Sequence, residues 1–186
     1  MYIVAQILGI LGMICFISSF QFKSGLTIIL AQLIGSAFYC VQYTLFSIIE
    51  GTLYMGVLMN VIGIFRGIVY YKRELFKADS IWWIVGFFTS YIVCYVLLFA
   101  VFELQPNAHN LIIEFMPILG MIIAQISFRQ KSASKIRAFG GATTIPWGLY
   151  HGFHLSIGGL IGEIINLISV IVGIIRYDLR RKKENL

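Results

Sequence analysis

Three polar residues lie deep inside long apolar stretches of this sequence. Asn60 is near the middle of the stretch 53–71, and Asn166 is near the middle of 159–177. Glu163 precedes Asn166 by three residues, which places both side chains on one face of a helix. Polar groups are costly inside a bilayer, so each is a candidate for a functional site. An amide carries both donors and acceptors, which suits the hydroxyls or ring nitrogens of a neutral solute.

Each of these side chains also has an alternative interpretation. Asn60 and Asn166 could instead form hydrogen bonds between helices. Glu163 could carry a coupling proton, bind a cationic group, pair with His151, or serve only as a hydrogen-bonded strut. The residue pattern leaves all of these roles open.

Two aromatic residues and two prolines extend the set of candidates. Tyr39 and Trp147 lie 108 positions apart in related stretches, and an opposed aromatic pair could sandwich a sugar ring or a base. Pro146 directly precedes Trp147, and Pro117 lies in the apolar stretch 111–128. A proline inside a helix frees a carbonyl and bends the axis. Such bends would serve gating, although prolines are also ordinary in spanning helices.

One arginine and three glycines share the stretch that contains Asn60. Arg66 lies roughly two turns before the end of that stretch. It could extend toward the membrane surface, or it could close a gate by binding a carboxylate or a carbonyl. Gly56, Gly63 and Gly67 form one stripe with Asn60 at near-helical spacing. Such a stripe is typical of close helix packing, and it also leaves room for a solute.

The composition places these residues in a membrane protein. Of 186 residues, 59% are hydrophobic and 12% are charged, whereas soluble domains are roughly 45–50% apolar. Seven apolar stretches have lengths close to the roughly 17–25 residues that a spanning helix needs. They are 2–20, 26–48, 53–71, 81–102, 111–128, 137–155 and 159–177. We therefore expect an all-α integral membrane fold with seven transmembrane helices surrounded by lipid.

The charged residues predict the orientation in the membrane. Of the 14 Lys and Arg residues, all but Arg66 fall in alternate connections on one side or in the C-terminal tail. By the positive-inside rule, the N-terminus then lies outside and the C-terminus lies in the cytoplasm. Because the basic residues flank the spans, they do not indicate a nucleic-acid partner. The opposite side carries acidic groups that would attract cations, unless its loops are merely polar. The residues on or near that side are Glu50, Glu103, Glu114, Glu163, His109, His151 and His154.

No catalytic or cofactor motif is present in the sequence. It contains no phosphate-binding P-loop, no GxSxG and no HExxH. Cys15, Cys40 and Cys94 lie in three different stretches without metal-ligand spacing, so neither a disulfide framework nor a metal site is indicated. We expect neither enzymatic activity nor a bound cofactor.

The two ends of the chain repeat each other. Residues 10–24 (ILGMICFISSFQFKS) and 118–132 (ILGMIIAQISFRQKS) match at an offset of 108. In the third stretch of each unit the offset becomes either 106 or 110, and the sequence does not decide between these two. With the fourth stretch left over, we predict two parallel three-helix repeats joined by a linker helix, a 3+1+3 plan. The expected units are the repeat 1–74, the linker region 75–104, and the repeat 105–186 with its basic tail.

Repeats of this kind predict a function. Two equivalent units that face each other form a central seam, and transporters of this plan bind their substrate there, near the middle of the bilayer. We therefore expect a facilitator or a proton-linked carrier for a small polar metabolite, neutral or cationic. The alternatives are gene duplication without a transport path, and a non-transporting membrane sensor or scaffold. The sequence also allows a homo-oligomer.

Several segments carry a resemblance to known families. They are EFMPILG (114–120), FRQKS (128–132), LSIGG (155–159) followed by Glu163, and GIIR (173–176). As a set they resemble the YgjV-like family of bacterial inner membrane proteins, which implies a seven-helix protein with a transporter-like fold and gives no substrate. The 3+1+3 plan also resembles the SWEET sugar transporters and the nicotinamide riboside type. The SWEET resemblance implies a pocket role for Asn60 and Asn166, and only at the offset of 106.

Overall fold

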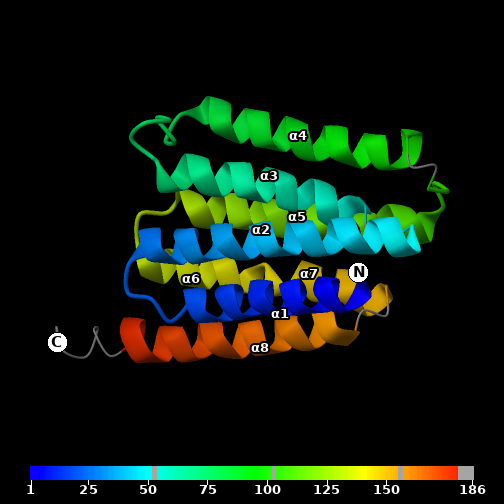
Figure 1. Ribbon diagram of the computed structural model, residues 1–186. Helices are drawn as coiled ribbons and strands as arrows, with labels where there is room; N and C mark the ends of the chain where they lie inside the picture. The colour runs from blue at the N-terminus through cyan, green and yellow to red at the C-terminus, as the bar shows by residue number, and fades with distance from the viewer. Residues whose placement is uncertain (52–53, 102–103, 155–156, 180–186) are drawn as a thin grey trace.

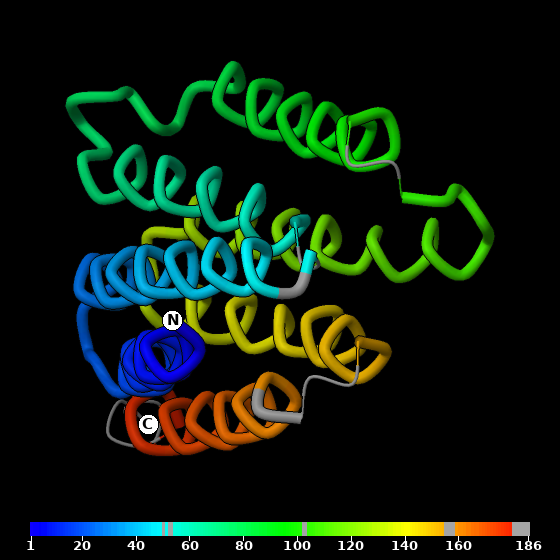
Figure 2. Tube along the Cα trace, turned by 45° about the vertical axis from the view of Figure 1, so that its right-hand side comes forward, coloured from blue at the N-terminus to red at the C-terminus, as the bar shows by residue number. Residues whose placement is uncertain are grey.

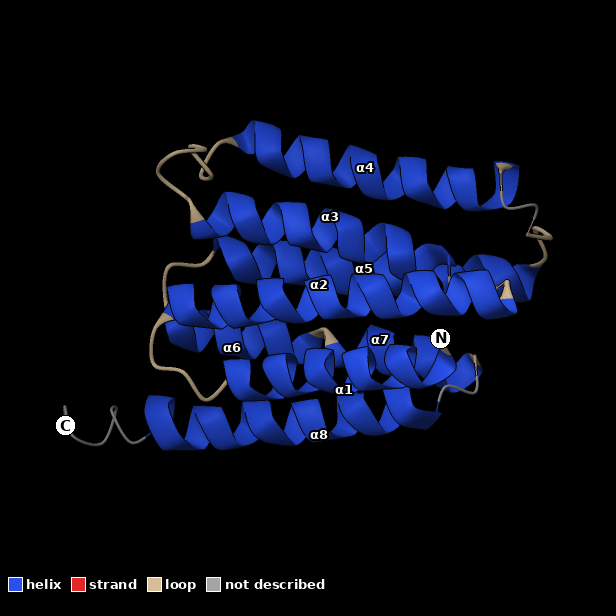
Figure 3. Ribbon diagram, in the orientation of Figure 1, coloured by secondary structure: helices blue, strands red, loops and turns tan. Residues whose placement is uncertain are grey.

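The protein is an all-helical bundle in the residues that the structure describes. The computed structural model describes residues 1–51, 54–101, 104–154 and 157–179, and all regular structure in these ranges is helical (Figures 1 and 3). The helices are α1 (Tyr2–Ser19), α2 (Gly25–Glu50), α3 (Tyr54–Tyr71), α4 (Ile81–Ala100), α5 (Ala108–Arg129), α6 (Ala133–Ala142), α7 (Thr144–Phe153) and α8 (Ile157–Gly173), which continues as the π-helix η1 (Ile174–Leu179).

Six of these segments are long and apolar enough to cross a membrane. They are α1 to α5, with α2 counted to Ile49, and the segment from Gly159 to Leu179. When α6 and α7 are counted as one pass, successive segments run in opposite directions along the bundle, so the chain passes from one end to the other and back (Figure 1). The expected all-α architecture with apolar helices of spanning length is confirmed for the described residues.

The expectation of a single helix over 137–155 is wrong. In its place are α6 and α7, of 10 residues each, which are individually too short to span a bilayer. Pro146 is the third residue of α7 and has no N–H to donate to the carbonyl of Ala142, so a continuous helix loses a hydrogen bond there. Pro146 instead occupies the first turn of α7, where proline is tolerated.

Two threonine hydroxyls stabilise this break. Thr143 donates to the Gly140 carbonyl at 2.6 Å, and Thr144 donates to the Gly141 carbonyl at 2.8 Å. These carbonyls are near the C-terminus of α6, where backbone acceptors lack helical partners. The side chains therefore satisfy them without water, and α6 and α7 together cover the length of one span.

The spans other than α4 form a closed ring. Packing contacts join α1 to α2, α2 to α3, α3 to α5, α5 to both α6 and α7, both of these to α8, and α8 back to α1. Figure 2 shows α1 lying between α2 and α8 at the point where the ring closes. The helix α4 packs on the outside of the ring, against α3 and α5 (Figure 1). All spans except α4 therefore border the interior of this ring.

One end of the bundle carries the basic connections. The segments between α1 and α2, between α3 and α4, and between α5 and α6 meet at the same end (Figure 1). They contain Lys23, Lys72, Arg73, Lys77 and Lys131. The basic residues of the tail, in 180–186, lie outside the described residues, as do Glu103 and the first two residues of the LSIGG segment.

Candidate functional site

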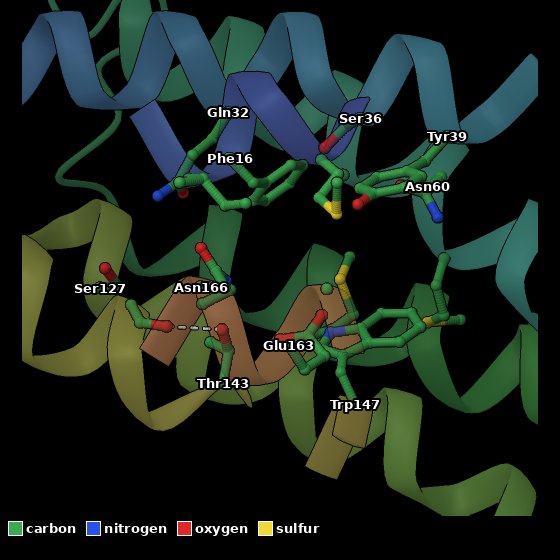
Figure 4. A pocket seen from close by; sticks show the side chains of 18 of the residues that line it. Phe16, Gln32, Ser36, Tyr39, Asn60, Ser127, Thr143, Trp147, Glu163 and Asn166 are labelled. Carbon is green, nitrogen blue, oxygen red and sulfur yellow. Dashed lines mark hydrogen bonds between the residues drawn. The ribbon is translucent and has the colours of Figure 1, made fainter. Parts of the chain in front are cut away.

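A small cavity lies inside the ring of helices. Its volume is about 80 Å³, and its walls come from α1, α2, α3, α5, α6, α7, α8 and Thr143. Six of the sequence-predicted site residues line it: Arg66, and Tyr39, Asn60, Trp147, Glu163 and Asn166, which Figure 4 labels. Side chains more than 100 positions apart in the sequence therefore converge on one space.

The two asparagines are both buried at this cavity but differ in their bonding. Asn60 donates from Nδ2 to the Gly56 carbonyl of its own helix at 2.8 Å. Asn166 is 6% exposed, and its Oδ1 has no hydrogen-bond partner. A buried acceptor without a partner costs roughly 1–3 kcal/mol, so Asn166 is poised to accept a hydrogen bond from something in the cavity.

Glu163 is the acidic group of the cavity. It is partly buried on α8, and the Asn166 side chain one turn further along interacts with its carboxylate. Tyr39 and Tyr43, which belong to α2, line the same cavity from another wall. No Lys or Arg pairs with Glu163 among the described residues, nor does His151, whose Nε2 instead lies 3.4 Å from the Tyr43 hydroxyl.

The aromatic residues form two facing walls. Figure 4 places Tyr39 on one side of the cavity, with Trp147 and Glu163 on the other. The Tyr39 ring lies 5.5 Å from Phe16 and 6.0 Å from Tyr43, measured between centroids. Trp147 stacks on His151 at 6.2 Å with an interplanar angle of 30°. These rings present π-faces to any solute between them.

Two glycines hold the opposed rings in place. A Cβ atom on Gly120 would lie 2.6 Å from Nε1 of Trp147, and one on Gly12 would lie 3.2 Å from Cδ1 of Tyr39. Both distances are shorter than ordinary carbon contacts, so each ring packs directly on a neighbouring backbone. The two pairs are related by the same offset of 108, because Gly12 corresponds to Gly120 and Tyr39 to Trp147.

Arg66 is buried at the cavity and does not extend to the membrane surface. It is 5% exposed and donates from Nη1 to the Met121 carbonyl at 3.1 Å and to the Tyr91 hydroxyl at 3.3 Å. The guanidinium carbon lies 4.9 Å from the centroid of the Phe128 ring. Its Nε has no partner, and no carboxylate pairs with it in the described part of the chain.

The two candidate gating prolines are buried near the cavity without lining it. Pro117 lies inside α5, and Pro146 lies in the first turn of α7. The lining also includes polar residues of α2 that the sequence interpretation missed, namely Gln32 and Ser36. Gln32 donates to the Ser19 hydroxyl at 3.1 Å. Both lie in the apolar stretch 26–48. Because polar groups are costly in a bilayer, their presence in that stretch was a signal that could have identified them.

Two arginines, the buried Arg137 and the partly buried Arg73, close the basic end of the bundle. Arg137 is 2% exposed; it pairs with Asp178 at 2.6 Å and donates to the Phe22 carbonyl at 2.7 Å. Arg73 donates to the Phe128 carbonyl at 2.7 Å and to the Gln130 carbonyl at 3.2 Å. Each arginine thus binds backbone in or next to a connection between two helices, which holds that end together.

At the opposite end, one ion pair of the expected acidic side is present. Nε2 of His154 lies 2.9 Å from Oε1 of Glu114, which is buried. The side chain of Glu50 lies outside the described residues, as Glu103 does. Among the residues described, no group of three or more His, Cys, Asp or Glu side chains is placed to hold a metal ion.

A second hollow opens sideways between α7 and α8. This groove of about 480 Å³ is mostly apolar and has Gly148 and Gly152 in its lining, and Glu163 lines it as well as the central cavity. Since its rim consists of exposed apolar side chains such as Ile145 and Leu149, it faces the hydrocarbon of the bilayer.

The comparisons with known proteins identify the family. The profile of Imp-YgjV, described as a bacterial inner membrane protein, matches residues 3–181. The chain belongs to this family. It is therefore a multi-pass protein of the bacterial inner membrane, as the segments EFMPILG and GIIR had indicated. Neither the comparison with curated proteins nor the comparison with solved structures gives a match.

Proposed function

We propose that this chain is a membrane transporter, a facilitator or a proton-linked carrier, for a small polar solute bound in the central cavity. The observation that supports this most is the cavity itself, which all spans except α4 line with polar and aromatic side chains. A volume of about 80 Å³ is far below the roughly 300–1,000 Å³ of sites for drug-sized ligands. The solute is therefore small, or the ring widens when it binds.

Related positions in the two halves support a 3+1+3 plan. The helices α2 and α6 begin 108 positions apart, at Gly25 and Ala133. Tyr43 and His151, also 108 apart, lie 3.4 Å from each other. Residues equivalent under a two-fold operation meet each other only near the axis, so this contact would mark the axis between the repeats.

The third helix pair favours an offset that differs from both sequence alternatives. An offset of 103 pairs Gly56 of α3 with Gly159 of α8. A Cβ on Gly56 would contact Tyr43, and one on Gly159 would contact His151, so equivalent residues pack alike at this offset. Glu163 then corresponds to Asn60. The pocket role of Asn60 and Asn166 thus rests on their places in the cavity, since the SWEET-like match at 106 loses support.

A transport cycle would require the two ends of the bundle to open in turn. The positive-inside rule assigns the basic end to the cytoplasm and the N-terminus to the outside. With Arg137 bound to Asp178 and to the α1–α2 connection, the cytoplasmic end would be closed in this conformation. Its opening would break these bonds while α6 and α8 move relative to α1.

The groove between α7 and α8 favours a second candidate function. A sensor or scaffold would bind a partner helix laterally, and glycines in the lining of an apolar groove allow such close approach. The groove is larger than the central cavity. The central cavity still carries the main proposal, because buried polar atoms in its lining, such as Oδ1 of Asn166, lack partners and a lateral helix would not supply them.

A thermal-shift screen of the purified protein tests this proposal. The panel contains sugars, nucleosides, vitamins, amines and amino acids, and a compound that binds the cavity should raise the unfolding temperature. Asn60→Leu, Asn166→Leu and Trp147→Ala should each abolish this shift while leaving expression and the unligated unfolding temperature largely unchanged. Equal loss of folded protein in all three variants would assign these residues to packing alone. If no compound of any class stabilises the wild-type protein, the result would support the sensor or scaffold function instead.

A further inference from the structure

We propose that the solute of the central cavity is a small zwitterion, with its cationic group at Glu163 and its anionic group at Arg66. This inference rests on the proposed binding role of the cavity and names the substrate class. It starts from an observation that the fold alone does not explain. One acidic and one basic side chain, Glu163 and Arg66, line the same small cavity, and neither forms an ion pair in the described residues.

The outer part of the cavity is built to receive a cation. The carboxylate of Glu163 lies beside Trp147 and opposite Tyr39 (Figure 4), and Tyr43 lines the same cavity. Aromatic faces attract ammonium groups, most strongly where water is excluded. A carboxylate next to several aromatic rings is therefore a site for an amine or a quaternary ammonium group.

The other part of the cavity is built to receive an anion. Arg66 uses only Nη1 in hydrogen bonds to protein, to the Met121 carbonyl and the Tyr91 hydroxyl, while its Nε has no partner. The guanidinium carbon lies 4.9 Å from the centroid of the Phe128 ring, and this contact restrains the position of the group. A guanidinium held in this way can bind a carboxylate with its remaining donors.

Because both groups line one small cavity, a single molecule can reach both of them. Glu163 on α8 and Arg66 on α3 line the same space of about 80 Å³. Asn166 lines it as well, and its free Oδ1 can accept a hydrogen bond from the ammonium group.

Charge balance favours a zwitterion over a simple ion. An unpaired charge in a low-dielectric site is costly, and an opposite charge of the ligand offsets that cost. A simple amine would compensate Glu163 and leave Arg66 unpaired, and a simple carboxylate would do the reverse. A zwitterion compensates both, and it leaves the net charge of the cavity unchanged.

The test compares three four-carbon compounds on the purified wild-type protein: γ-aminobutyrate, butylamine and butyrate. Glycine, β-alanine and 5-aminovalerate extend the zwitterion series in length. At least one zwitterion should raise the unfolding temperature and bind at least tenfold more tightly than the amine or the carboxylate of the same length. Equal affinity for the amine would overturn the role of Arg66, and binding of none of the zwitterions would overturn the proposal.

Variants then assign each end of the ligand. Glu163→Gln should weaken the zwitterion at least tenfold, to the level of butyrate, and Arg66→Gln should weaken it to the level of butylamine. Arg66→Lys keeps the charge and should bind better than Arg66→Gln, which separates charge from folding. Asp79→Asn and Lys131→Gln, which change an exposed pair outside the cavity, serve as controls and should leave binding unchanged.

The two proposals fail in different ways. If sugars or nucleosides stabilise the protein through the cavity and zwitterions do not, the zwitterion inference is wrong and the proposed transport function still stands. If a zwitterion binds as described but proteoliposomes do not move it across the membrane, the binding site remains and the transport function is wrong.

Discussion

Gly63 offers a perturbation whose effects on folding and on binding have opposite signs. It lines the cavity from α3, and a methyl group added there would lie 3.6 Å from Oγ of Ser36 and 3.7 Å from Cε of Met121. These are ordinary contact distances, so Gly63→Ala needs no rearrangement of the fold. Replacing a glycine inside a helix should stabilise the protein by roughly 0.5–1 kcal/mol.

The same methyl group occupies space that a solute needs. The cavity is about 80 Å³, and one water requires roughly 10–15 Å³ of such space, so the loss of one methyl volume is a substantial part of it. Overpacking of this kind costs about 1–3 kcal/mol. The affinity for the best ligand of the thermal-shift screen should therefore fall roughly 5- to 150-fold, and Gly63→Val should lower it further.

Gly86 provides the matched control. It lies in α4, and no atom is within 4 Å of the Cβ that a substitution would add. Gly86→Ala should give the same gain in unfolding temperature and no change in affinity. The measurements are thermal unfolding in detergent and titration of the ligand by the shift in unfolding temperature. Unchanged affinity in Gly63→Ala, with wild-type stability or better, would refute the assignment of this cavity as the binding site.

Three further predictions follow from the topology, the acidic group and the closed end of the bundle. Asn107→Cys should react with an impermeant thiol reagent in intact cells and Ala133→Cys should not; the reversed pattern would contradict the proposed orientation. Glu163→Gln should retain substrate exchange but lose accumulation driven by a pH gradient if Glu163 carries a coupling proton, whereas joint loss or joint retention of both would contradict that role. Asp178→Asn should lower the free energy of unfolding by about 3–5 kcal/mol, because Arg137 then stays buried without its counter-charge. Removing an exposed ion pair would cost at most about 1 kcal/mol. An unchanged unfolding temperature would contradict the closing role of the Arg137–Asp178 pair.

Much of the fold could be predicted from the sequence because the bilayer constrains it strongly. Continuous apolar stretches of spanning length leave few options besides helices, and the described helices lie close to six of the seven predicted ranges. The exception is the stretch 137–155, which α6 and α7 share. There Pro146 removes a backbone donor, and the hydroxyls of Thr143 and Thr144 donate to the Gly140 and Gly141 carbonyls near the end of α6. A pattern of hydropathy does not register such local hydrogen bonding.

The candidate site was predictable in membership but not in detail. The cost of polar groups in lipid pointed to Asn60, Glu163 and Asn166, and all three line the cavity. The packing of Gly159 on His151 was not predictable, because a glycine in an apolar stretch does not indicate which side chain lies against it. The hydrogen-bond partner of Arg66 was also not predictable from the sequence. It is the backbone carbonyl of Met121 on another helix, and every residue type carries such a carbonyl.

The most direct test of the transport function is counterflow in proteoliposomes. Vesicles loaded with the unlabelled compound that stabilises the protein most would be diluted into a trace of the same compound carrying a radiolabel. Wild-type protein and Gly86→Val should accumulate the label transiently, and Gly63→Val, in which side-chain atoms fill the cavity, should not. Binding without any counterflow in the wild-type protein, or equal counterflow in Gly63→Val, would contradict a solute path through the ring of helices.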